Sequence, residues 1–275
     1  MARLFEGYKF TGKILPFESF RPFLDKKQDL TKAWSDERKN SCIKQAESYL
    51  QEKIPSLPAT LYAQFRRNGN RSLYETPYFE RRVMAISLAC AEAIENKGRF
   101  TDKLMDVVWA ILEETTWVVP AHNNGGEQLF NQYKETVKDI DLFSAETGSC
   151  LAWVYYLCKD KLDKESPVSC KRIYYEINRR LLTPFVTYEY AWAVIYINNW
   201  VPWIVSNILI AAAFVERDID KREKIVSHAL PILDNFTNTY GEDGGCEEGP
   251  NYWARAGAAY FDCLEALYDM SGGEI

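Results

Sequence analysis

Apolar residues recur at intervals of three and four along most of this chain, which is the spacing that one buried face of an α-helix requires. The first such run follows Ser35 and Asp36, and Pro55 and Pro58 end it. No strictly alternating stretch flanked by turn signals stands out, so the sequence predicts an all-α fold. The pattern is most regular after Pro77, where it predicts helices over roughly residues 78–97, 140–160, 167–190, 203–216, 219–239 and 250–270. It also predicts a helix that follows Thr101 and has apolar positions from Leu104 to Leu112.

Several residues mark where these helices begin and end. Gly98 closes one helix, Thr101 is expected to cap the next, and Asp218 or Asp220 caps the helix over 219–239. Pro250 suits the first position of the last helix, because the N–H that proline lacks would have no partner there.

The chain divides into an N-terminal segment and a helical body. Residues 1–76 are predicted to be irregular apart from one helix, with 59–76 forming a long loop or a strained short helix. Residues 77–275 form helical hairpins that recur every ~40–60 residues without a repeated sequence. We expect the segment to pack on the hairpins, so that 1–275 is one domain.

Three loops rich in Asn, Gly, Trp and carboxylates are each separated by two helices. They cover residues 117–126, 197–203 and 241–253. If consecutive helices run up and down, loops that are two helices apart emerge at the same end. We therefore expect all three loops to line one edge of the molecule, called the rim below, and loops held by a rigid scaffold commonly carry function.

The rim has groups that suit a sugar, which presents both apolar C–H faces and hydroxyls. Asn123 supplies an amide, and tryptophan rings supply apolar faces, although any one ring could instead pack the end of a helix. These tryptophans are Trp117, Trp200, Trp203 and Trp253.

Composition limits the partners. The net charge of −6 argues against nucleic acid, which needs a basic face. A local basic cluster is nevertheless present, with Arg66 and Arg71 followed by Arg81 and Arg82. The cluster is either a solvated surface or a local site for acidic sugar groups, in which Arg66 and Arg71 would bind the substrate.

The cysteines and the apolar runs bear on the compartment. The seven cysteines are an odd number without a metal-binding or redox spacing, and no cofactor motif is found. The first residues lack the apolar core of a signal peptide, and no apolar run approaches the ~18 residues of a membrane span. Reduced thiols without an export signal favour a cytoplasmic protein with no membrane partner.

The carboxylates of the last loop allow two interpretations. Glu242, Asp243, Glu247 and Glu248 could supply the paired carboxylates of a glycosidase. Glu248 could instead accept hydrogen bonds from the free N–H groups of the helix that Pro250 opens.

Tyr252 and His122 are the other candidates for proton transfer. Tyr252, in the first turn of the last helix, is either a core residue or an acid/base whose phenol needs a supportive site. His122 is the only imidazole expected on the rim, whereas His228 lies in an apolar helix and is expected to be structural.

Residues ~100–270 resemble the N-terminal helical domain of the heparinase II/III-like polysaccharide lyases. The specific parts are the asparagine–tryptophan pair and the turn D-G-x-x-x-E-G-P-x-Y-W. The resemblance implies an incomplete α/α toroid, which is a ring of helical hairpins around a central cleft, followed by a β-sandwich domain. The resembling stretches are 141–153, 198–214 and 243–260.

The resemblance also implies β-elimination at a uronic acid of an acidic oligosaccharide. Asn198 or Asn199 would neutralise the substrate carboxylate, and Tyr252 would serve as base and acid. Glu248 would support the site and His122 would assist. Because the chain ends at Ile275, we expect the β-sandwich, which supplies a second histidine in such families, to be missing from this chain. The alternatives are a toroid glycoside hydrolase and a non-catalytic carbohydrate-binding or protein-binding helical scaffold.

Overall fold

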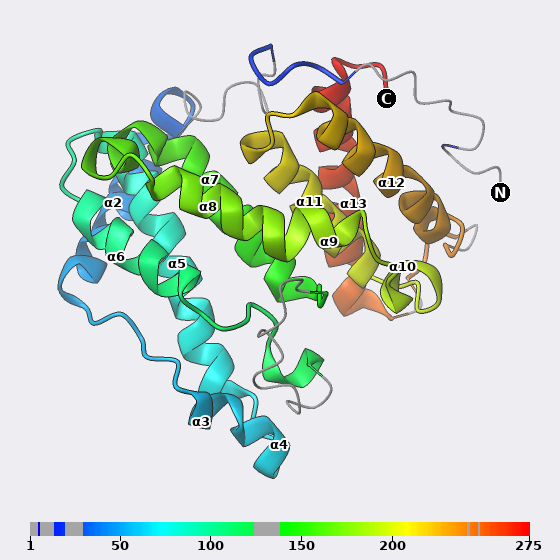
Figure 1. Ribbon diagram of the computed structural model, residues 1–275, viewed down its shortest axis with the longest axis horizontal. Coiled ribbons are helices and arrows are strands. Elements are labelled where there is room, and N and C mark those ends of the chain that lie inside the picture. The colour runs from blue at the N-terminus through cyan, green and yellow to red at the C-terminus, as the bar shows by residue number, and fades with distance from the viewer. Residues whose placement is uncertain (1–4, 6–13, 20–29, 124–137, 241–242, 247) are drawn as a thin grey trace.

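The structure is a computed structural model that describes residues 5, 14–19, 30–123, 138–240, 243–246 and 248–275. Within these residues every regular element is a helix, which confirms the all-α prediction (Figure 1). The long helices are α2 (Asp36–Gln51), α5 (Ser72–Glu95), α6 (Thr101–Leu112), α7 (Leu142–Glu165), α8 (Ser169–Ile177), α11 (Trp200–Val215), α12 (Ile219–Thr237) and α13 (Pro250–Ser271). The short ones are α3 (Ala59–Tyr62), α4 (Gln64–Asn68), the 3-10 turn η2 (Pro120–His122), the π-helical turn η5 (Asn178–Leu182), α9 (Thr183–Phe185) and α10 (Ala191–Val194).

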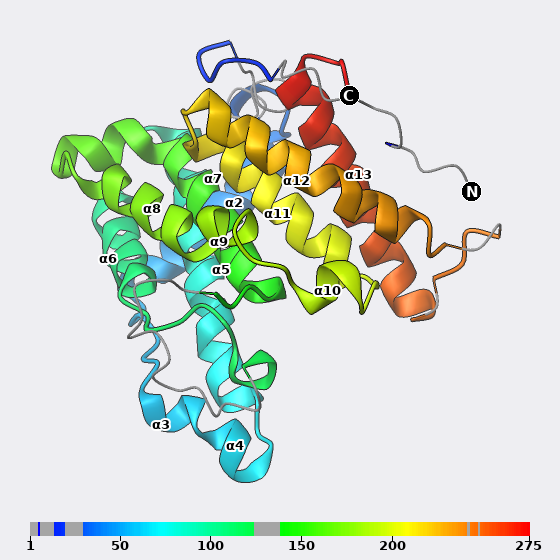
Figure 2. The same cartoon turned by 45° about the vertical axis from the view of Figure 1, so that its right-hand side comes forward.

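The helices form two layers. Helices α5, α7, α11 and α13 lie side by side in chain order, and α6, α8 and α12 pack on α5, α7 and α11 as a second layer (Figure 2). Helix α11 is apolar on nearly every side because α7, α12 and α13 surround it, and a helix that is apolar all round has to be buried. From α5 to α13 the chain alternates between the two layers, as expected for successive helical hairpins. Closure into a toroid stays a prediction.

The helix starts are partly as expected. Asp218 caps α12, since its carboxylate accepts from the N–H groups of Asp220 and Lys221. Pro250 is the first residue of α13, as predicted. The prediction that Thr101 caps α6 is wrong, because Thr101 is already inside the helix and no side chain caps this end.

Helix α5 begins earlier than the sequence pattern indicated. It starts at Ser72, where the side-chain oxygen of Asn70 accepts from the N–H of Leu73 at 3.0 Å. Pro77 lies inside the helix and is tolerated there, although a proline lacks one backbone donor. The boundary expected between residues 76 and 77 therefore falls within α5, and residues 59–76 hold α3, α4 and the first turn of α5.

The helix expected over 167–190 is interrupted. Helix α8 passes through the π-helical turn η5 into α9, which ends at Phe185. The short α10 and a turn then lead to α11, which starts at Trp200 instead of residue 203. Its N-cap is Asn199.

The three connections expected to share an edge do so. His122 of the first connection packs on Trp200 of the second, and Glu248 of the third accepts from the N–H of Asn199 in the second. At the opposite end the N–H of Leu15 donates to the carbonyl of Met270 at 2.8 Å, which ties the N-terminal segment to α13. Among the described helices, none has the length and apolar content needed to cross a membrane.

Candidate functional site

Asn199 and Glu248 join two of the rim loops. One carboxylate oxygen of Glu248, Oε2, accepts from the backbone N–H of Asn199 at 2.9 Å and from its Nδ2 at 2.5 Å. Because Asn199 is the N-cap of α11, Glu248 satisfies donors at the start of α11. The expected cap of α13 by Glu248 is therefore wrong, and the N-cap of α13 is Gly249, which has a φ of 83° and makes no side-chain cap.

The neighbouring amide of Asn198 has a different environment. Its Oδ1 accepts from the N–H of Trp200 at 3.0 Å, and this contact fixes which side of the amide is oxygen. Asn198 is partly exposed, whereas Asn199 is 3% exposed. Among the described residues, no hydrogen-bond partner is found for Nδ2 of Asn198. The Nδ2 of Asn199, by contrast, donates to Glu248.

His122 lies at the rim between two aromatic rings. Its Nδ1 is 2.8 Å from Oδ2 of Asp141, the N-cap of α7. The imidazole stacks on Phe143 with ring centroids 5.4 Å apart and planes at 9°, and its centroid is 4.8 Å from that of Trp200. The side chain is 14% exposed. His122 and Trp200 therefore meet as the topology predicted.

Trp203, Glu146 and Arg255 form the adjoining part of the rim. The indole N–H of Trp203 and Nη2 of Arg255 both donate to Oε1 of Glu146, at 2.8 and 2.7 Å. The guanidinium of Arg255 stacks over the Trp203 ring, 3.7 Å from the centroid. Burial raises the pKa of Glu146, against the opposing effects of Trp203 and Arg255. Arg255 itself is about half exposed, with 47% of its side chain accessible.

Tyr252 and Trp253 are both exposed at the start of α13, at 45% and 58%. Tyr252 precedes Arg255 by three positions and the buried Ala256 by four, so helical spacing puts it on the face of α13 that turns to α11. The indole N–H of Trp253 donates to the carbonyl of Gly244 at 3.1 Å. Trp253 lines a separate groove of about 400 Å³ beside α12, so the structure does not bring it to Trp200 and Trp203.

A second groove, of about 280 Å³, leads away from the rim between α5, α7 and α11. Phe143 and Glu146 line it as well as the rim, so the groove is continuous with the cluster around His122 and Trp203. Its walls are mostly apolar and aromatic. They include Phe79, Val83, Ile86, Phe143, Trp153 and Asn207.

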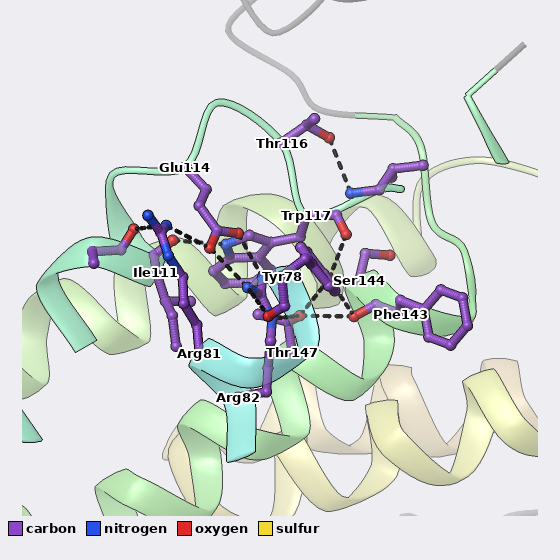
Figure 3. A network of polar contacts seen from close by, with 12 residues as sticks. Tyr78, Arg81, Arg82, Ile111, Glu114, Thr116, Trp117, Phe143, Ser144 and Thr147 are labelled. Carbon is purple, nitrogen blue, oxygen red and sulfur yellow. Dashed lines mark hydrogen bonds and ion pairs between the residues drawn. The ribbon is translucent and has the colours of Figure 1, made fainter. Parts of the chain in front are cut away.

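A buried polar network supports the base of this region (Figure 3). The hydroxyl of Tyr78 lies 2.7 Å from the carbonyl of Trp117 and 2.8 Å from Oγ1 of Thr147. Arg82 donates to Thr147 and, at 2.5 Å, to Oε2 of Glu114. The network links α5, α7 and the connection that carries His122, so the loop is held from below by fully buried groups.

Two residues assigned to sugar binding are core residues. Trp117 is 2% exposed and donates from its indole N–H to the carbonyl of Ile111 at 3.1 Å. Asn123 is 3% exposed and donates from Nδ2 to the hydroxyl of Tyr62 at 2.7 Å. Both assignments are corrected, because these side chains turn inward to satisfy buried polar groups and present no surface to a ligand.

The arginine cluster separates into two groups. Arg81 and Arg82 are buried and paired with Glu114, so they are not a solvated face. Arg66 lies in α4, which packs against η2, and Arg71 precedes α5 and pairs with Glu75 at 2.9 Å. Both are exposed, and no hydrogen bond or ion pair of the described residues joins them to His122 or Asn198.

The paired carboxylates expected in the last loop are not seen together. Asp243 is exposed and accepts from the N–H of Gly245 at 2.9 Å, within its own turn. Glu248 is bound to Asn199. Glu242 and Glu247 lie outside the described residues.

Sequence reasoning missed several members of the cluster. Asp141, Phe143 and Glu146 belong to a stretch noted only for its resemblance. The Asp-x-x-Ser capping pattern at Asp141 marks the start of α7 and was the available signal. Arg255 was identifiable only by its helical spacing from Tyr252.

No metal site accompanies the cluster. Within the part of the chain that the structure describes, no three His, Cys, Asp or Glu residues are grouped to hold a metal ion. All seven cysteines are free thiols.

A comparison of the sequence with models of known protein families gave no match, and a search of curated proteins gave no significant relative.

Proposed function

We propose that this chain is a lyase module that cleaves uronate-containing oligosaccharides by β-elimination, as the resemblance to heparinase II/III-like lyases implies. The observation that carries the proposal is the convergence of Asn198, His122, Trp200 and Arg255 on one rim, continuous with an aromatic groove. Amide, imidazole and guanidinium groups beside tryptophan faces suit a ligand that is both a sugar and an acid.

Asn198 is the better candidate to neutralise the substrate carboxylate. β-Elimination removes the proton on C5, and the charge that develops spreads into the neighbouring carboxyl group. Donors placed at that group therefore lower the barrier. The Nδ2 of Asn199 donates to Glu248, whereas the Nδ2 of Asn198 has no partner among the described residues. In this proposal Glu248 acts indirectly, by holding the start of α11 in place.

Arg255 supplies the positive charge that the chain as a whole lacks. Its guanidinium is held in one plane by the Trp203 ring and by a single bond to Glu146, which leaves further N–H donors toward solvent. A carboxylate or sulfate of a neighbouring sugar would complete its coordination. Recognition of such an anion matters because the net charge of −6 gives no overall attraction to an acidic glycan.

Tyr252 is the proposed base, and it would return a proton to the leaving oxygen. A tyrosine that acts as both base and acid needs a supportive site. Arg255 lies one helical turn away on the same face of α13, which supports this assignment.

The hydrolase alternative lacks a matching carboxylate pair among the described residues. Glu248 is bound to Asn199, and Asp243 is exposed in its own turn. A non-catalytic sugar-binding scaffold would use the same tryptophans and Arg255, so only turnover separates it from the lyase.

The test compares two tyrosines of α13. The wild-type chain and its Tyr252→Phe and Tyr268→Phe variants are incubated with uronate oligosaccharides, and the ultraviolet absorbance of the unsaturated product is followed. Tyr252→Phe is expected to lower the rate by about 10²–10⁴-fold, the usual effect of removing a general acid or base. Tyr268, 59% exposed near the other end of the helix, serves as the matched control and should leave the rate unchanged.

Tryptophan fluorescence provides an independent binding measurement for the same variants, because Trp200 and Trp203 lie in the cluster. Wild-type turnover that survives Tyr252→Phe would remove Tyr252 from the mechanism. Binding without turnover by the wild-type chain would leave the scaffold as the function.

A further inference from the structure

We propose that Asp141 is a positioning residue that fixes the tautomer of His122, so that Nε2 is the proton-accepting atom which this imidazole presents at the rim. This inference adds to the proposed function. The use of Nε2 in catalysis rests on that proposed function. The arrangement itself is a property of the free protein and can be measured without substrate.

Both oxygens of Asp141 are engaged. Oδ1 accepts from the N–H of Ser144 at 2.7 Å, and Oδ2 contacts Nδ1 of His122 at 2.8 Å. In return the hydroxyl of Ser144 accepts from the N–H of Asp141 at 2.9 Å, which completes a capping box at the start of α7. The carboxyl group is 3% exposed and therefore has one orientation, set by the helix that it caps.

This orientation determines which nitrogen carries the proton. A carboxylate only accepts hydrogen bonds, so the Nδ1 atom of His122 has to be the donor in the contact with Asp141. In the neutral imidazole Nε2 then has the free lone pair. Among the described residues Nε2 has no hydrogen-bond partner.

The ring is also prevented from turning over. Phe143 stacks parallel to it on one side and Trp200 packs against it at 53°. Phe143 lies two residues after Asp141, so one turn of α7 supplies both the hydrogen-bond acceptor and the stacking face. A ring flip about the Cβ–Cγ bond would put Cδ2 in the place of Nδ1 and so break the bond to Asp141.

The decisive variant is Asp141→Asn. Asparagine is as good an N-cap as aspartate, so its oxygen still accepts from Ser144 and α7 keeps its start. The amide NH₂ then faces His122 in place of Oδ2. Because it donates, it requires a lone pair on Nδ1 and drives the proton to Nε2. The same replacement in the serine-protease triad produces the wrong histidine tautomer, an effect described for that system.

The measurement is the side-chain ¹⁵N NMR spectrum of the 275-residue chain at about pH 8, above the ordinary histidine pKa of about 6.5. The chain has two histidines, and His228, which packs edge-on against Phe185, is the internal control. We expect the wild-type His122 to show a protonated Nδ1 and an unprotonated Nε2. In Asp141→Asn these two signals should exchange while those of His228 stay in place.

A wild-type spectrum with the proton on Nε2 overturns the inference, even if the variant fails to fold. A folded Asp141→Asn variant with an unchanged His122 tautomer overturns it as well. Where the wild-type chain forms unsaturated product, Asp141→Asn should lower kcat by about 10²–10⁴-fold with little change in KM. If the chain forms no such product, the proposed function fails while the NMR result still decides the role of Asp141.

Discussion

Glu176 is a buried carboxylate of α8 that is shared by several arginines. It is 2% exposed and accepts from Arg172 at 3.1 Å, Arg179 at 2.7 Å and Arg180 at 2.7 Å. Burial alone would raise its pKa, but the arginines outweigh burial and hold the pKa of Glu176 below its usual range. Since Arg180 also donates to the carbonyl of Glu114, this group ties the second layer to the connection that carries His122.

We therefore predict that Glu176→Gln lowers the free energy of unfolding by about 3–5 kcal/mol near pH 7, because it leaves the buried Arg180 without its counter-charge. A carboxyl whose pKa is lowered on folding contributes stability that is complete above its unfolded pKa of about 4.3 and is lost as pH falls through its folded pKa. The difference between wild type and variant should accordingly shrink at about pH 3.

Urea unfolding at both pH values measures this effect. The exposed Glu165, at the end of α7, provides the control, and Glu165→Gln should change stability by less than about 0.5 kcal/mol. An equal loss for Glu176→Gln at both pH values would contradict the electrostatic explanation and indicate a packing effect instead.

For single residues, the sequence predicted which loops meet better than it predicted which way a side chain points. His122 with Trp200, and Asn199 with Glu248, meet because topology alone brings their loops to one edge. Trp117 was misassigned because a loop position does not reveal whether a side chain turns outward. The indole of Trp117 points inward, where its N–H donates to the carbonyl of Ile111. Partners such as Asp141 and Arg255 depend on contacts between helices that no local pattern contains.

At the scale of single elements, helical periodicity predicted which segments are helical and missed where some of them break. Helix α8 continues through η5, and nothing in the apolar spacing distinguishes a π-helical turn from an α-helical one. This turn packs closely on α7. A Cβ atom added at Gly148 would lie 2.5 Å from Cδ2 of Leu181, which is completely buried.

We predict that Gly148→Ala destabilises the protein by about 1–3 kcal/mol, because Leu181 has to move within a packed core. Gly257 in α13 is the matched comparison, since a Cβ atom there meets nothing within 4 Å. Gly257→Ala should stabilise the protein by about 0.5–1 kcal/mol through its helix propensity alone. Thermal unfolding of the two variants measures both effects, and a Gly148→Ala variant as stable as Gly257→Ala would contradict the close contact between α7 and η5.

At the scale of the whole molecule, the two layers explain why the rim exists. Each hairpin returns the chain to the same edge, so connections far apart in sequence meet there, as His122 meets Trp200 and Glu248 meets Asn199. The buried network of Tyr78, Arg82 and Glu114 then holds one of these connections firmly against α5 and α7 (Figure 3). The sequence predicted this up-and-down order, because loops that are two helices apart emerge at the same end. Closure of the layers into a ring depends on packing angles that a linear pattern does not encode.

The mass balance of the products tests the central claim most directly. The 275-residue chain is incubated with a uronate oligosaccharide of defined length, and the masses of all products are determined. Elimination predicts two products whose masses add up to that of the substrate, one of them carrying an ultraviolet-absorbing double bond. Products whose summed mass exceeds the substrate by one water would show hydrolysis and contradict the proposed lyase, and an intact substrate that nevertheless binds would contradict catalysis altogether.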